Sequence, residues 1–185
     1  MRKVMAAALS GFALIGLVGT ASAQQDVTPI HKTKAELQQQ ADEFTAHQLQ
    51  SYPEIFPGAR FVTPRPWGGL RDGVLEDGQQ YMANEVRFKK PGAEQWEWTS
   101  LITQVNAPGF FGSSPEEFCE ERTCTGTVSD DQGGVTVFSE DDRYNDRVAH
   151  NFRPNGEVVF VQGSREEDPA ELAAIASDRA YTFTR

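Results

Sequence analysis

The sequence predicts an α+β fold with an N-terminal helix, a curved antiparallel β-meander of five to seven strands, and a short C-terminal helix. Three observations lead to this prediction. A capping box and an apolar stripe begin at residue 33, alternating strands separated by turns begin at residue 79, and Asp-Pro-Ala-Glu begins a second helix at residue 168. Helices that cover the apolar face of an antiparallel sheet form a stable layered architecture.

The first helix is predicted from its capping signal. Thr33 fits the N-cap position and Glu36 the third helical position, which together form a capping box. An apolar stripe at helical spacing follows, made by Leu37, Ala41, Phe44 and Gln48 with Leu49 beside them. We expect Pro53 to end this helix, because the residue before a proline is shifted toward an extended conformation.

Residues 53–78 are rich in Pro and Gly, and they predict a long loop with a short edge strand at 60–63. Arg65, Trp67 and Arg71 place a large aromatic side chain and two cations in this loop. Long ordered loops often carry function, so these three residues are the candidate binding residues. The alternative interpretation, which the general behaviour of buried aromatics favours, is that Trp67 closes an open end of the core.

The middle of the chain alternates as antiparallel strands do. In residues 81–88 the apolar side chains fall on one face, and residues 89–92 form a turn. A second strand is expected at 95–105, with Trp96, Trp98 and Ile102 on one face. Further strands are expected at 124–128, 135–138, 147–152 and 157–161, with Asn155-Gly156 as the hairpin turn before the last of them.

The last helix is predicted from Asp168 as N-cap and Pro169 as the first helical residue. Leu172 and Ile175 then form its inner face, which we expect to pack on the apolar strand 158–161.

The first residues predict export. Arg2 and Lys3 precede an apolar run at 4–18, and Ala21-Ser22-Ala23 forms a small-residue cleavage site. We therefore expect a signal peptide at 1–23, a flexible leader at 24–32 and a single globular domain at 33–185. A membrane anchor is the alternative, but the run of about 15 residues is shorter than the roughly 20 of a spanning helix. The protein is expected to be secreted and extracellular, or periplasmic if the host has an outer membrane, with no membrane span after signal removal.

Export also decides how the cysteines are interpreted. Cys119 and Cys124 enclose four residues, and a pair of thiols outside the cytoplasm normally forms a disulfide. The alternative is a redox or metal pair. It is disfavoured because the spacing differs from C-x-x-C and no His or further Cys lies nearby in the sequence.

Composition excludes several classes of protein. The chain has 185 residues, a formal net charge of -10 and a pI near 4.8, so this acidic protein is not expected to bind nucleic acid. Twelve Phe and three Trp exclude a wholly disordered chain. Two cysteines are too few for a disulfide scaffold or a four-thiolate zinc site.

The order of elements in the C-terminal third resembles a known group of proteins. A Gly-rich acidic turn leads to a strand, the hairpin Arg153-Pro154-Asn155-Gly156-Glu157 and a short helix at 171–178, and Cys119 and Cys124 precede them. This arrangement is similar to exported proteins of high-GC Gram-positive bacteria that have no established activity. Such proteins often carry a lipobox cysteine, which this chain lacks. The resemblance implies architecture and location, and it supplies no catalytic residues.

No catalytic motif stands out in the sequence. His31 falls in the leader and His47 near the exposed end of the first helix, while His150 alternates with Val148 and Phe152 and is expected to pack in the core. None of the common hydrolase, metalloprotease or phosphate-binding motifs is present. We therefore assign no catalytic residues, no metal and no cofactor.

Acidic residues bracket the strand at 135–138, namely Asp130, Asp131, Glu140, Asp141, Asp142 and Asp146. Carboxylates from two turns at one end of a sheet could bind Ca²⁺ through oxygen ligands. Their spacing does not match the calcium-loop pattern, however, and Arg143 and Arg147 lie among them as partners for ion pairs. A solvated acidic rim is the favoured interpretation.

The sequence favours a secreted, non-enzymatic binding or interaction protein, whose ligand is an unknown protein or small molecule. One alternative is an exported hydrolase that acts through carboxylates, whose separation in space cannot be read from sequence spacing. The other is a secreted protein inhibitor that docks on its target through a protruding loop.

Overall fold

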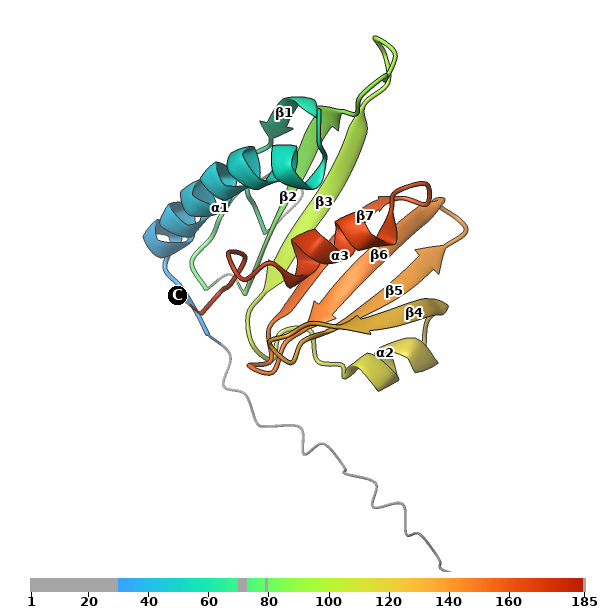
Figure 1. Ribbon diagram of the computed structural model, residues 1–185. Helices are drawn as coiled ribbons and strands as arrows, with labels where there is room; N and C mark the ends of the chain where they lie inside the picture. Colours follow the sequence, from blue (N-terminus) through green and yellow to red (C-terminus); the bar gives the residue numbers. More distant parts are fainter. Residues whose placement is uncertain (1–29, 70–72, 79, 185) are drawn as a thin grey trace, which may run out of the picture.

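One open sheet of seven antiparallel strands and three helices make up the described part of the chain, so the fold class is α+β as predicted (Figure 1). The computed structural model describes residues 30–69, 73–78 and 80–184. The expected signal peptide, residues 24–29 of the expected leader, and Arg71 lie outside the described residues. In chain order the elements are α1 (Lys34–Ile55), β1 (Arg60–Pro64), β2 (Tyr81–Lys89), β3 (Thr99–Asn106), α2 (Pro115–Glu120), β4 (Cys124–Ser129), β5 (Val135–Asp141), β6 (Asp146–Phe152), β7 (Val158–Ser164) and α3 (Pro169–Ser177).

Helix α1 begins where its capping box predicts, with Thr33 at the N-cap and Glu36 bonded back to it. The expected end at Pro53 is wrong, because the helix continues to Ile55 with Pro53 inside its last turn. Two contacts stabilise that turn. The Phe56 N–H donates to the Tyr52 carbonyl oxygen, and the buried Tyr52 ring packs against the Phe56 and Phe88 rings. Tertiary packing therefore outweighs the local preference of the residue before proline.

The strand order is β1-β2-β3-β7-β6-β5-β4. Strands β1 to β3 form one meander, after which the chain crosses to the far edge of the sheet and returns through β4, β5 and β6 to β7. Strand β7 pairs with β3 and joins the two meanders into one sheet. This crossing leaves β1 and β4 as the two edge strands.

The strand expected at 95–105 begins only at Thr99. The ladder with β2 ends at the pair Phe88–Thr99, and Pro91 in the following loop has no N–H to extend it. The Lys89 ammonium donates to the carbonyl oxygens of Glu94 and Gln95, which holds residues 90–98 in a separate loop. This loop projects beyond the body of the sheet (Figure 1).

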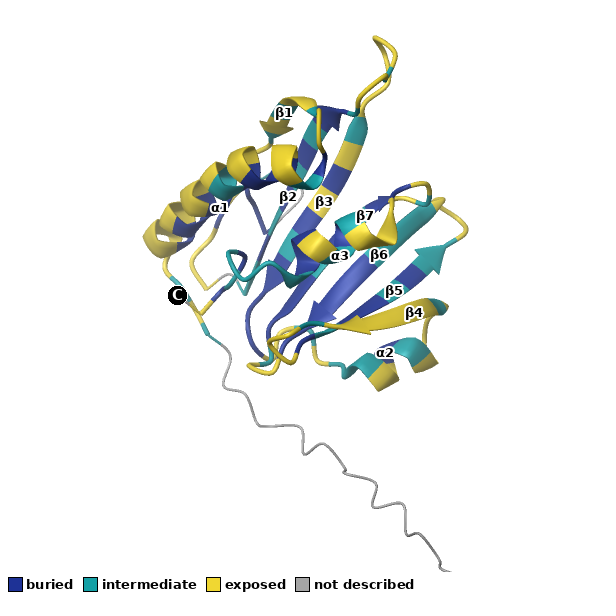
Figure 2. Cartoon of the chain, viewed as in Figure 1, coloured by how far each residue is buried: buried dark blue, intermediate teal, exposed yellow. Residues whose placement is uncertain are grey.

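Helices α1 and α3 cover the same face of the sheet (Figure 1). The main core lies between them and the strands, and Leu37, Phe44, Val86, Leu101, Val159, Val161, Leu172 and Ile175 are among its buried side chains. The predicted inner face of α3 is thus confirmed, and so is that of α1 except for Leu49, which is 49% exposed because it lies at the side of the buried stripe. Figure 2 shows the same arrangement, with the outer side of α1 exposed and the strands behind the helices buried.

Helix α2 was not anticipated from the sequence. Ser114 and Glu117 form a capping box and Pro115 takes the first helical position, so the helix has a local signal in the sequence. Its buried Phe118 joins Val137, Phe152 and Val158 in a second, smaller cluster. That cluster lies on the face of the sheet opposite α1 and α3, and it covers only the β5–β6–β7 part of that face.

Candidate functional site

The face of the sheet opposite α1 and α3 is open where α2 does not reach. Residues directly opposite each other in an antiparallel ladder point to the same face. The registers therefore place Glu85, Ile102, Gln162 and Val148 in one row across β2, β3, β7 and β6. We call the region around this row the open face. Ile102, at its centre, is 39% exposed although its neighbours in the strand, Leu101 and Thr103, are fully buried.

Two hollows adjoin on the open face and share Ile102. The larger has a volume of about 840 Å³ and runs from Trp98 in the loop at 90–98 to Gln162 and Asp146. The smaller has a volume of about 410 Å³ and lies between Arg65 and Tyr81. Polar and charged side chains make up most of the lining of the larger hollow, and Trp98 and Ile102 are its main exposed apolar groups.

Trp98 is the main aromatic side chain of this site. It is 43% exposed, and its ring has the Arg87 guanidinium 5.3 Å and the Lys89 ammonium 5.1 Å from its centroid. Cations at this distance are attracted to the face of the indole ring. Trp98 therefore presents an aromatic surface flanked by two cations beside the hollows.

Phe61 extends the aromatic surface onto the edge strand β1. Its ring lies 6.4 Å from Trp98 and is 66% exposed. Its backbone has a φ of 59°, in the left-handed region that bulky side chains rarely adopt, at a bulge between Arg60 and Thr63. A strained residue that displays an exposed aromatic ring is a pointer to function.

The candidate binding residues from the sequence are separated by the structure. Trp67 is 3% exposed and packs against the Phe44 and Tyr181 rings, as the core-closing interpretation predicts. Arg65 lies at the open face, where its Nε is 2.9 Å from Glu85 Oε2. Arg71 lies outside the described residues. The structure thus brings Arg65 to the candidate site and places Trp67 in the core.

Sequence reasoning missed Trp98, Phe61 and Ile102 as site residues. The Trp-Glu-Trp sequence at 96–98 was assigned to a strand, and alternation does not tell which face of a strand is covered. One signal for the site was available in the sequence. Ile102 is predicted on the face opposite Leu101 and Val105, and since these two are buried in the core, Ile102 lies on the other face of the sheet.

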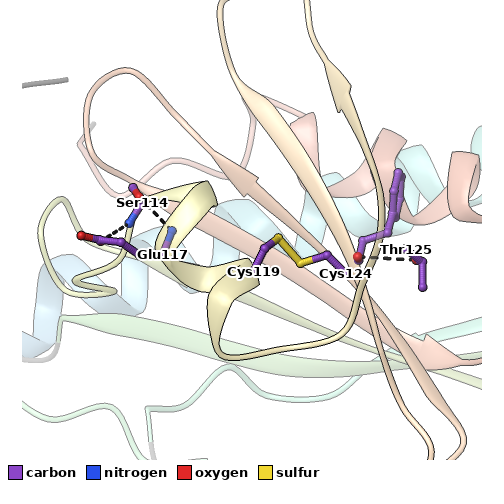
Figure 3. Close-up of a disulfide and its surroundings, with 6 residues drawn as sticks. Ser114, Glu117, Cys119, Cys124 and Thr125 are labelled. Atoms are coloured by element: carbon purple, nitrogen blue, oxygen red, sulfur yellow. Dashed lines mark hydrogen bonds between the residues drawn. A yellow bond between two sulfur atoms is a disulfide. The ribbon is translucent and has the colours of Figure 1, made fainter. Parts of the chain in front are cut away.

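The cysteines and His150 lie away from the open face, around α2. A disulfide joins Cys119 in α2 to Cys124 at the start of β4, as predicted (Figure 3). His150 is buried beside Phe118, with ring centroids 4.4 Å apart. Burial, together with the positive charge of Arg122, lowers the pKa of His150 to about 3. The expected packing of His150 in the core is confirmed, and the lowered pKa keeps the ring neutral, but the expected hydrogen bond is missing at Nδ1, which has no partner among the described residues.

His47 differs from its prediction. It is only partly exposed, and its Nε2 lies 2.6 Å from Asp178 Oδ2 beyond the end of α3. This pair links the two helices that cover the core.

The two acidic turns lie at opposite ends of β5, so they do not form one carboxylate cluster. Asp130 pairs with Arg179, Glu140 with Arg147 and Arg165, and Asp141 with Arg143. The expected role of Arg143 and Arg147 as ion-pair partners is confirmed. Within the described ranges, no group of three or more His, Cys, Asp and Glu residues could hold a metal ion.

Shifted pKa values among the described carboxyl groups all fall below their ordinary values. Hydrogen bonds from the Arg143 side chain lower the pKa of Asp141 to about 2, and those from Arg147 and Arg165 lower the pKa of Glu140. Hydrogen bonds from the Thr33 backbone N–H and side chain lower the pKa of Glu36. Burial acts to raise the pKa of Asp130, but hydrogen bonds from the Gly134 and Gln132 N–H groups and the Asn151 side chain, together with the Arg179 charge, hold it below its ordinary value. Carboxylates held ionised in this way serve ion pairing and capping, whereas a general acid needs a raised pKa.

No family model matches this chain, and comparisons with curated proteins and with solved structures likewise give no match. The resemblance to exported proteins of high-GC Gram-positive bacteria stays a prediction. In the part of the chain that the structure describes, every helix is too short or too polar to cross a membrane.

Proposed function

We propose that this protein is a secreted, non-enzymatic binding protein that holds its ligand against the open face of the sheet. The observation that carries the proposal is the partly exposed Ile102 at the centre of two adjoining hollows, with Trp98 beside them. Ser100 and Gln162 line the larger hollow next to Ile102 and supply hydrogen-bonding groups. Two exposed apolar side chains among many hydrogen-bonding and charged groups suit a polar small-molecule or peptide ligand.

The charged groups near the site support binding over catalysis. Arg65 and Glu85 are paired, and Arg87 lies over the Trp98 ring, so these groups already have partners that fix their positions. The carboxyl groups with shifted pKa values are stabilised in their ionised form elsewhere in the protein. These features agree with a preformed recognition surface.

Ligand capture with matched variants tests the proposal. The exported form, residues 24–185, is immobilised and exposed to culture supernatant and envelope extract, and the retained peptides, proteins and small molecules are identified by mass spectrometry. Ile102→Asp and Trp98→Ala should abolish retention of at least one ligand that the parent retains. Leu49→Ala, which changes an exposed apolar residue on the outer side of α1, is the control and should retain it.

Circular dichroism of each variant checks that the fold is kept. If the parent and the two open-face variants retain the same molecules in the same amounts, the open face is not the binding site.

A secreted inhibitor is the second candidate, and one observation favours it. The loop at 90–98 projects from the sheet (Figure 1). It carries Trp96, which is 76% exposed. A protruding loop with an exposed tryptophan can enter a cleft of a target protein. In the same capture experiment, Trp96→Ala would then abolish retention of a protein target while Ile102→Asp would not.

A further inference from the structure

Helix α2 covers part of the sheet face to which the open face belongs. Side chains two residues apart in a strand point to the same side. His150 therefore lies on the same side of β6 as Val148, and Phe160 on the same side of β7 as Gln162. Phe118 of α2 lies over His150, with ring centroids 4.4 Å apart. If α2 moved aside, the open face would extend along β6 and β7 to His150 and Phe160.

Helix α2 is held to the sheet by few contacts. It has six residues, of which only Phe118 is buried. The hydrogen bonds of residues 111–122 all stay within that segment, including the reciprocal pair of Ser114 and Glu117 (Figure 3). The packing of Phe118 and the disulfide at Cys119 therefore hold α2 in place.

A glycine suited to act as a hinge precedes α2. The Gly109 N–H donates to the Gly156 carbonyl oxygen at 3.2 Å, which fixes the chain to the hairpin between β6 and β7. Gly112 lies between this point and the N-cap Ser114. It has a φ of 75° and, apart from its chain neighbours, no atom within 4 Å of the position that a Cβ would take. Glycine rotates at such a site with little steric resistance. At the other end of α2, the disulfide to Cys124 limits how far the helix can move.

We propose that α2 is a lid on the open face, which turns about Gly112 on its disulfide tether and uncovers His150 and Phe160. Opening lengthens the surface that a ligand can contact, a consequence that rests on the proposed function. Closing leaves the buried His150 Nδ1 without a hydrogen-bond partner among the described residues. An unpartnered buried polar atom is unfavourable, and opening to water removes this cost.

Acid should open the lid, because the covered ring of His150 is disfavoured as a cation. The side chains around it from β5, β6, β7, α2 and the segment before α2 carry no charge: they are Val137, Phe152, Phe160, Phe118 and Phe111. The charged group that acts on the ring is Arg122, and burial together with this like charge lowers the pKa of His150 to about 3.

An opened lid returns the His150 ring to water, where its ordinary pKa is 6.5. Between pH 6.5 and about pH 3 the open form therefore binds a proton that the closed form does not bind. The open fraction should rise as the pH falls through this window, on the order of tenfold per pH unit for one proton.

Hydrogen exchange of the exported form, residues 24–185, measured by mass spectrometry without ligand from pH 6.5 to about pH 4.5, tests the proposal. Amides of α2 should be protected at least about tenfold less than those of α3, which lies on the other face of the sheet. After correction for the intrinsic exchange rate, their protection should fall on the order of tenfold per pH unit. Equal protection of α2 and α3 would mean that α2 opens only when the whole fold unfolds, and it overturns the lid.

Two histidine variants test the trigger. His150→Phe keeps an aromatic ring beneath Phe118 but cannot be protonated, so the protection of α2 should no longer change with pH. His47→Gln is the matched control, because it removes a partly exposed histidine that pairs with Asp178 away from α2. It should keep the pH dependence of the parent. A pH dependence of α2 that persists in His150→Phe, or that is absent from the parent, overturns opening by acid.

The double variant Cys119→Ser, Cys124→Ser removes the tether. Protection of α2 should then fall on the order of tenfold or more at pH 6.5, while α3 keeps a higher protection than α2. Unchanged protection of α2 in this variant overturns the role of the disulfide. Circular dichroism verifies that each variant is folded. No ligand is present in these measurements, so their outcome is independent of whether the open face binds one.

Discussion

Arg153 and Glu157 form an ion pair whose side chains are almost completely buried, with Arg153 Nη1 and Glu157 Oε2 3.1 Å apart. The guanidinium also donates to the carbonyl oxygens of Ala176, Asp178 and Tyr181. Glu157 in turn accepts from the backbone N–H groups of Phe183 and Thr184 and from the Thr182 hydroxyl. The hairpin between β6 and β7 therefore holds the C-terminal segment in the core.

Removing one partner of this pair should be strongly destabilising. Glu157→Gln leaves the Arg153 charge buried without its counter-ion, which costs about 3–5 kcal/mol of unfolding free energy. Urea unfolding of residues 24–185 measures it. Glu85→Gln removes the partly exposed pair with Arg65 and should cost at most about 1 kcal/mol. If Glu157→Gln lowers the unfolding free energy no more than Glu85→Gln does, the buried pair contributes no more to stability than the partly exposed pair.

His150 is a buried ionisable side chain whose protonation should affect the stability of the fold. Its ring is surrounded by Phe111, Phe118, Phe152 and Phe160, with centroids within 6.5 Å. Apolar surroundings disfavour the protonated ring, and the pKa falls from the ordinary 6.5 to about 3. The unfolded chain then binds a proton below pH 6.5 that the folded chain does not bind until about pH 3.

Stability should therefore fall as the pH drops from 6.5 toward 3, since the unfolded state binds more protons in that window. One proton corresponds to a slope of at most about 1.4 kcal/mol per pH unit. His150→Phe removes the proton and should flatten the curve above about pH 5.5, where the lowered carboxyl groups contribute little because they are ionised in the unfolded chain too. Urea unfolding of parent and variant at several pH values measures this difference. Parallel curves between about pH 5.5 and 6.5 would contradict the assignment.

At the scale of elements, α3 is the clearest case of a helix specified by its own residues. The Asp168 side chain accepts from the Ala170 N–H at 2.8 Å, and Pro169 is the first helical residue, both as predicted. Leu172 and Ile175 are fully buried in the core that contains Val159 and Val161. The helix thus covers the β6–β7 part of the sheet.

Two substitutions separate its cap from its packing. Asp168→Ala should cost about 1 kcal/mol through the lost cap, and Leu172→Ala about 2–5 kcal/mol through lost burial and a cavity. Thermal melts measure both changes. A Leu172→Ala variant that melts like the parent would mean that α3 does not stabilise the fold.

The loop at 90–98 shows where prediction from sequence fails at this scale. Alternation from Trp96 to Ile102 is that of a strand, yet the ladder stops at Thr99 because the partner strand ends at Lys89. Helix α2 has a local capping signal, but it is only six residues long. A helix of that length shows no helical periodicity of apolar residues, so it was not predicted. The first and last residues of a strand or helix depend on where its partner strand ends or on tertiary packing. The periodicity of apolar residues gives no information on either.

At the scale of the whole molecule, export and oxidation are tested together by mass. Protein purified from the culture medium should begin at Gln24, because Ala21-Ser22-Ala23 is the predicted cleavage site. Without reductant it should be two hydrogen atoms lighter than after reduction, because Cys119 and Cys124 are bonded. Retention of residues 1–23 would contradict export, and free thiols that alkylate readily would contradict the disulfide in the purified protein.

The residues at the candidate site show which features of this protein could not be predicted from its sequence alone. The chain by itself determined the capping box of α1, the Asp168 cap of α3, the Asn-Gly hairpin and the inner faces of the strands. Each of these depends on residues a few positions apart, whose hydrogen bonds and spacing are local. Only the tertiary structure decided that Trp67 lies in the core and Trp98 at the surface, and that β7 inserts beside β3. Exposure and strand order depend on which distant segment covers a face, and that choice is made by the packing of the whole chain.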